Sequence, residues 1–103
     1  MSQLAIAAVE MDGEGRLFVR PASGDFEHIY RAAMEVYWDR SSKRLFHPHA
    51  PRDWTSADWF RQIVAAVASE YGVQLQLMSN TIWVDVPAGA RSEIEADQPI
   101  ESS

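Results

Sequence analysis

The stretch TSADWFRQIVAAVASEYG, residues 55–72, contains the signals of one amphipathic helix. Its large apolar residues recur at intervals of three and four positions, so they share one face of a helix and leave the other face polar. This apolar stripe is formed by Phe60, Ile63, Val64, Val67, Ala68 and Tyr71. We therefore predict the main helix of the protein over residues 56–71.

Both ends of this helix are marked in the sequence. Thr55 and Asp58 have the spacing of a capping box, in which each side chain bonds to the backbone of the other residue. Trp54 and Trp59 have the spacing of a hydrophobic staple across the same end. Gly72 follows the apolar stripe, at the position where a left-handed residue commonly ends a helix.

Two strands are predicted after the helix, over residues 73–78 and 81–86. A two-residue turn at Ser79-Asn80 would pair them as an antiparallel hairpin whose aliphatic side chains all face the helix. These inward residues would be Val73, Leu75, Leu77, Ile82, Val84 and Val86. The opposite face would expose one indole, and exposed aromatics are typical of contact surfaces. The candidate interface residues are therefore Gln76, Met78 and Trp83.

A second hairpin is predicted near the N-terminus, with strands over residues 4–11 and 16–20. The turn Asp12-Gly13-Glu14-Gly15 joins them, because glycine accepts positive φ at low cost. The simplest register places Val9 opposite Phe18.

The segment 25–39 fits two different structures. One is a second helix over residues 25–34, followed by a hairpin with arms at 35–39 and 44–47. The other is a single long bent strand, favoured by the strand-prone residues that end the segment. Either structure gives an α+β fold with about six short antiparallel strands packed on one main helix.

The distribution of apolar residues along the chain predicts one domain and a tail. Residues 1–87 contain all the predicted elements and form a single compact domain. Residues 88–103 carry four carboxylates against one arginine and few apolar side chains, so we expect an acidic, disordered C-terminal tail.

The composition narrows the classes of function. The chain has 103 residues, no cysteine and a net charge of −6, which excludes disulfides and thiolate metal sites and disfavours non-specific nucleic-acid binding. No apolar stretch approaches the roughly 20 residues that span a bilayer, so we expect a cytoplasmic protein without a membrane partner. The sequence has neither a nucleophile elbow nor a phosphate-binding glycine loop, which favours a protein that is not an enzyme.

Two histidines, His47 and His49, lie two positions apart in an extended segment, so their side chains point the same way. Such pairs bind divalent metals, but the spacing is generic and no third histidine is close in sequence, so we predict neither a metal nor another cofactor. A small-molecule site here would use one histidine as the general base. The candidate ligand-binding residues are Tyr37, His47, His49, Arg52 and Trp54.

A basic segment overlaps this region and lies among aromatic residues, a combination that holds phosphates and stacks on bases. The candidate nucleic-acid residues are Arg40, Lys43, Arg44 and Arg52. The acidic charge of the whole chain makes nucleic acid the least favoured of the three classes of partner.

One part of the chain resembles a known group of proteins. The run Asp58-Trp59-Phe60-Arg61-Gln62-Ile63-Val64, followed by Glu70-Tyr71-Gly72 and the strand with Leu75 and Leu77, is similar to small α+β proteins encoded on mobile, integron-type gene cassettes. The resemblance implies a compact, often self-associating domain without assigned chemistry or catalytic residues.

The leading hypothesis is a non-catalytic protein-interaction module that binds itself or another protein through the outer face of its sheet. A small-molecule-binding protein or enzyme, and a nucleic-acid binder, are the alternatives. The sequence does not identify a partner or ligand.

Overall fold

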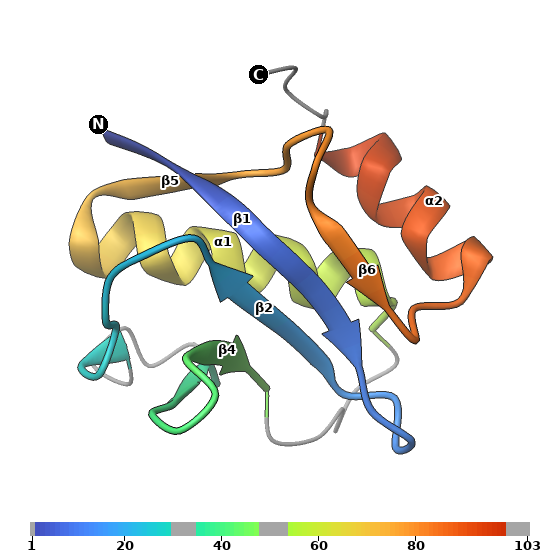
Figure 1. Ribbon diagram of the computed structural model, residues 1–103, viewed down its shortest axis with the longest axis horizontal. Helices are drawn as coiled ribbons and strands as arrows, with labels where there is room; N and C mark the ends of the chain where they lie inside the picture. Colours follow the sequence, from blue (N-terminus) through green and yellow to red (C-terminus); the bar gives the residue numbers. More distant parts are fainter. Residues whose placement is uncertain (1, 30–34, 48–53, 99–103) are drawn as a thin grey trace.

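The main helix packs against one face of a six-stranded mixed sheet (Figure 1). The computed structural model describes residues 2–29, 35–47 and 54–98. The elements are β1 (Ser2–Met11), β2 (Leu17–Pro21), β3 (Tyr37–Asp39), β4 (Arg44–Phe46), α1 (Ser56–Tyr71), β5 (Val73–Gln76), β6 (Ile82–Val84) and α2 (Ala88–Asp97). The strand order is β3-β4-β2-β1, and β5 and β6 both pair with the other edge of β1. The predicted α+β fold is confirmed.

The main helix, α1, begins and ends where the sequence predicts. Thr55 Oγ1 accepts a hydrogen bond from the Asp58 N–H at 3.2 Å, and Asp58 Oδ2 accepts one from the Thr55 N–H at 3.0 Å. At the other end Gly72 adopts φ 65°, and its N–H donates to the carbonyl of Ala68 at 3.0 Å. The helix buries Trp59 together with most of the predicted apolar stripe, which anchors it to the sheet.

The N-terminal hairpin forms, but its predicted register is wrong by one residue. Glu10, rather than Val9, lies opposite Phe18. The Asp12 N–H donates to the Arg16 carbonyl at 3.1 Å, so the loop has three residues and ends on Gly15 at φ 82°. The pairing shifts again between Ile6 and Ala8, where a β-bulge interrupts β1.

The predicted hairpin at Ser79-Asn80 is wrong. β5 and β6 do not pair with each other; both run parallel to β1, β5 beside residues 2–5 and β6 beside residues 8–10. The Thr81 N–H donates to the Met78 carbonyl at 3.1 Å in the intervening turn. The Thr81 hydroxyl accepts from the Met78 N–H at 2.9 Å and donates to the Ile6 carbonyl at 2.7 Å. After this turn the chain pairs again with the same edge of β1, farther along that strand. β1 has ten residues, so it is long enough to pair with both short strands.

The parallel pairing reverses the predicted orientation of β6. Trp83 pairs with Val9 and packs against the core, whereas Ile82 and Val84 are exposed at 56% and 39%. Leu75 and Leu77 are buried as predicted. The prediction of inward aliphatic residues is therefore correct before the turn and also for Val86, which packs against the core. It is wrong for Ile82, Val84 and the indole of Trp83.

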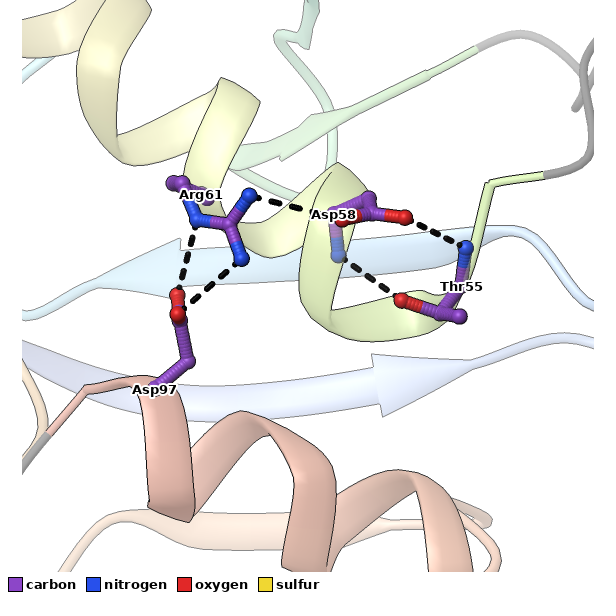
Figure 2. A network of polar contacts seen from close by, with 4 residues as sticks. All are labelled: Thr55, Asp58, Arg61 and Asp97. Carbon is purple, nitrogen blue, oxygen red and sulfur yellow. Dashed lines mark hydrogen bonds and ion pairs between the residues drawn. The ribbon is translucent and has the colours of Figure 1, made fainter.

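Residues 88–97 form α2 instead of a disordered tail, so that prediction is wrong for this segment. Ile94 is fully buried against the core, and the Arg61 guanidinium joins the two helices by binding Asp97 at 3.1 and 3.0 Å (Figure 2). The same guanidinium lies 3.4 Å from Asp58, so it links α2 to the capping box of α1. Ile94, this ion pair and the Arg91 guanidinium, which lies 4.9 Å from the Trp83 ring centroid, therefore dock a segment that otherwise has little apolar surface.

The hairpin predicted in the middle of the chain is confirmed, since β3 and β4 pair antiparallel with Trp38 opposite Leu45. The alternative of one long bent strand is wrong, because residues 26–29 form a turn in which the Ile29 N–H donates to the Phe26 carbonyl at 3.1 Å. Residues 30–34, half of the proposed second helix, lie outside the described residues. In the described ranges no helix is both long and apolar enough to cross a bilayer.

Candidate functional site

The face of the sheet turned away from α1 carries a continuous row of side chains. Residues paired in register on neighbouring strands point to the same side of a sheet. Successive pairs therefore form one line across β6, β1, β2, β4 and β3, which we call the outer row. The outer row consists of Val84, Glu10, Phe18, Phe46 and Tyr37. In Figure 1 α1 passes behind the sheet, so this is the face turned to the viewer.

Contacts among neighbouring side chains give the centre of the outer row a fixed shape. The Phe18 and Phe46 rings stack with centroids 5.4 Å apart, and Tyr37 lies 6.1 Å beyond Phe46. The Arg44 guanidinium lies 4.1 Å above the Phe18 ring and 3.0 Å from the Glu10 carboxylate. Cation–π attraction and the half-buried ion pair hold Arg44 over the Phe18 ring, and Glu10 neutralises its charge there.

The apolar side chains that remain exposed gather on this face. In the described residues, the exposed large hydrophobic side chains are those of Tyr37, Ile82 and Val84, and Tyr37 is 44% exposed. Val84 and Tyr37 are the two ends of the outer row, and Ile82 lies two residues before Val84 on the same side of β6. Apolar residues concentrated on an uncovered face are typical of a contact surface.

The predicted interface residues are only partly on this surface. Gln76 alternates with the buried Leu75 and so lies on the outer face, half-buried. Met78 is half-buried in the turn before β6. Trp83 points inward, and the Arg91 guanidinium of α2 lies 4.9 Å above its ring. The prediction that Trp83 lies on the outer face is therefore wrong.

The described ligand-binding candidates do not form one pocket. His47 is buried, stacks on Trp59 at 4.1 Å, and accepts a hydrogen bond from the Leu17 N–H at its Nε2 atom. Tyr37 lies in the outer row, on the opposite side of the sheet from His47, because His47 follows the outer-row residue Phe46. The Trp54 ring lies 4.6 Å from that of Trp59, the residue on which His47 stacks. A histidine in this position has a packing role and is not a solvent-accessible general base.

Two of the five ligand-binding candidates, His49 and Arg52, lie outside the described residues. Trp54 also lines a hollow of about 360 Å³ with Asp58, Arg61, Gln62 and Ala65. His47 does not line this hollow.

Each described nucleic-acid candidate lies beside a carboxylate. Arg40 Nε is 2.8 Å from Glu27, and Lys43 Nζ is 3.2 Å from Asp25. Arg44 is held by Glu10 in the outer row. Each of these cations therefore has a counter-ion nearby, although the Arg40 and Lys43 pairs are exposed and weak, whereas the Arg44 pair is half-buried.

The carboxylate of Asp39 holds the loop between β3 and β4. The hydroxyls of Ser42 and Ser41 donate to Asp39 at 2.7 and 3.0 Å, and these hydrogen bonds lower the pKa of the Asp39 carboxyl. Lys43, whose N–H donates to the Asp39 carbonyl at 2.7 Å, closes the loop with φ 55°.

Sequence reasoning missed Val84, Ile82 and Phe46 as surface residues. For Ile82 and Val84, the alternation with Trp83 is visible in the sequence, but whether their side chains point inward or outward depends on which strand pairs with β6. Within the described part of the chain, no group of three or more His, Asp or Glu side chains is placed to hold a metal ion.

Comparisons with known proteins place the chain in a family. The model of the family described as Integron Cassette Protein Hfx_Cass5 matches residues 4–81. A solved structure from the mobile metagenome of North West Arm Sewage Outfall, also described as Integron Cassette Protein Hfx_Cass5, is 48% identical and covers 94% of this chain and 96% of its own, with a TM-score of 0.47. No curated protein matches this chain. The family match and the sequence identity show that the chain belongs to the Hfx_Cass5 family of integron cassette proteins.

Proposed function

We propose that this protein is a non-catalytic interaction module that forms a homodimer through the outer row. The observation that supports the proposal is the concentration of Tyr37, Ile82 and Val84 on the face opposite α1. Isolated exposed hydrophobics are normal on any protein, but the large ones in the described part of this chain share one surface. Covering that surface with a partner would remove them from water.

The arrangement of the outer row favours a second copy of the same chain as the partner. The row is apolar at both ends, with Val84 at one and Tyr37 at the other, and its one ion pair lies between them. A two-fold axis along the strands, passing over Phe18, would place Val84 of each copy against Tyr37 of the other. The Arg44–Glu10 pair is neutral, so the contact would bring no unbalanced charge to its centre. Two sheets packed in this way lie about 10 Å apart.

The experiment compares two variants that each add one carboxylate. Val84→Glu adds it at one end of the outer row, whereas Ser69→Glu adds it at an exposed position of α1 on the other side of the molecule. Both positions are exposed, so we expect both variants to fold, which circular dichroism checks. Sedimentation equilibrium over a range of concentrations gives the dimer dissociation constant for each.

We expect the wild type and Ser69→Glu to be dimers of equal affinity. Val84→Glu should raise the dissociation constant at least about 100-fold, because dimerisation would bury two unpaired carboxylates. A wild-type monomer at high concentration would refute self-association. If the wild type captures a different protein instead, or if Val84→Glu remains a dimer, the proposed contact is also wrong. The cytoplasmic location expected from the sequence is part of the same proposal.

A further inference from the structure

A hollow of about 430 Å³ lies beside the outer face, between the end of β2 and the loop that joins β3 to β4. Its polar lining consists of Arg20, Ser23, Ser41, Ser42 and Lys43, and Ala7, Pro21, Ala22 and Gly24 complete it. The lining thus contains two cations and no carboxylate, in a chain whose net charge is −6. Asp25 binds Lys43, and Asp39 accepts hydrogen bonds from Ser41 and Ser42, so the excess positive charge of the hollow comes from Arg20. Positive charge in a concave site attracts an anion.

Arg20 differs from the other described cations. The remaining Lys and Arg residues of the described ranges each have a carboxylate within 4.0 Å, whereas Arg20 has none. Its exposed guanidinium therefore retains all five N–H donors. Ser23 makes no hydrogen bond within the described part of the chain, so its hydroxyl is also an unused donor.

Lys43 supplies the second cation, from the loop between β3 and β4. Its ammonium binds Asp25 at 3.2 Å, but both side chains are about 60% exposed, so the ion pair is weak and leaves two further N–H donors. Lys43 also adopts φ 55°, a left-handed conformation that lysine rarely takes. A strained residue at the edge of a hollow is a common feature of binding sites.

From this arrangement we propose that the hollow binds the phosphate group of a small phosphate-bearing molecule. Arg20 and Lys43 would bind the phosphate oxygens from two sides, with charge-assisted hydrogen bonds, and Ser23 would add a neutral donor. The hollow lies within the range of sizes that hold small ligands, so there is room for the rest of such a molecule. Neither Val84 nor Tyr37 lines this hollow, although Arg20 lies on the outer face of the sheet, two residues from Phe18.

The test measures binding of inorganic phosphate to the full chain by titration calorimetry, with acetate as the carboxylate arm and sodium chloride at matched ionic strength as the blank. We expect saturable phosphate binding and weaker acetate binding. Arg20→Gln should weaken phosphate binding at least about tenfold, because a charge-assisted contact is lost. Arg40→Gln is the matched control, since Arg40 is a nearby exposed arginine outside the lining.

A second variant separates binding from folding. Lys43→Gly removes the ammonium and also relieves the left-handed strain, so it should unfold at a higher temperature than the wild type while binding phosphate more weakly. Absence of saturable phosphate binding would overturn the proposal. Equal weakening by Arg20→Gln and Arg40→Gln would also overturn it, because diffuse charge rather than this hollow would then account for the binding. Stronger binding of acetate than of phosphate would assign the hollow to carboxylates instead.

Discussion

Replacing Thr81 by valine tests the arrangement of β5 and β6 on β1. The Thr81 hydroxyl is buried and makes two hydrogen bonds, one from the Met78 N–H at 2.9 Å and one to the Ile6 carbonyl at 2.7 Å. Valine has nearly the same shape but cannot make either bond. The Met78 N–H and the Ile6 carbonyl would then lose this partner in a dry environment.

The expected loss of stability follows from these two bonds. Losing the partner of a buried polar group costs about 1–3 kcal/mol, so two such groups, one of them half-exposed, predict about 2–4 kcal/mol for Thr81→Val. For a domain of this size, that corresponds to a fall in Tm of roughly 10–25 °C. Thr81→Ser keeps the hydroxyl and loses one methyl group, so it should cost only about 1 kcal/mol.

Urea unfolding followed by tryptophan fluorescence measures both variants in the same assay. If Ser79-Asn80 were instead a two-residue hairpin turn, Thr81 would lie at the surface, and valine would be neutral or slightly stabilising because it favours strands. A free energy of unfolding for Thr81→Val equal to that of the wild type, or above that of Thr81→Ser, would refute the parallel arrangement.

Two further predictions concern α2 and the start of α1. Ile94→Ala should destabilise the protein by about 2–5 kcal/mol in urea unfolding, because Ile94 is fully buried. Glu93→Ala replaces an exposed neighbour and should change the free energy of unfolding little. Equal losses of stability in the two variants would mean that α2 does not dock. The Thr55 backbone N–H donates to the Asp58 carboxylate, and this hydrogen bond is the main cause of the lowered pKa of Asp58. The ionised carboxylate therefore stabilises the fold above about pH 4. This stabilisation is lost as the pH falls through the pKa of Asp58 in the folded protein. Asp58→Asn should therefore reduce the loss of stability between about pH 5 and about pH 3, and an unchanged pH profile would contradict this assignment.

The parts of the fold that local signals determine were predictable from sequence. The capping box at Thr55 and Asp58 and the left-handed Gly72 act within a few residues of the helix ends, so their effect does not depend on the rest of the chain. The hairpin of β3 and β4 was predictable for the same reason, since its turn residues lie between the two strands they join.

The pairing of β6 depended on a contact that is distant in sequence. The residues 81–86 alternate in the same way whether they pair with residues 73–78 or with β1, but the two choices point Trp83 in opposite directions. The helix α2 was missed because its apolar content is low, and its docking depends on Ile94 and on the Arg61–Asp97 ion pair. The outer row combines five strands, so no single segment revealed it.

The parallel pairing of β1 with β5 and β6 has a consequence for biosynthesis. β1 leaves the ribosome well before the two strands that complete its edge, since Ser2 pairs with Val73 and Glu10 with Val84. Until Val84 has been made, one edge of β1 has open backbone hydrogen-bonding groups and attracts the strands of other nascent chains. Because such non-local pairing is slow to form, we expect the protein to refold in milliseconds to seconds. We also expect aggregation during expression to be most severe for variants in which β5 and β6 pair late with β1.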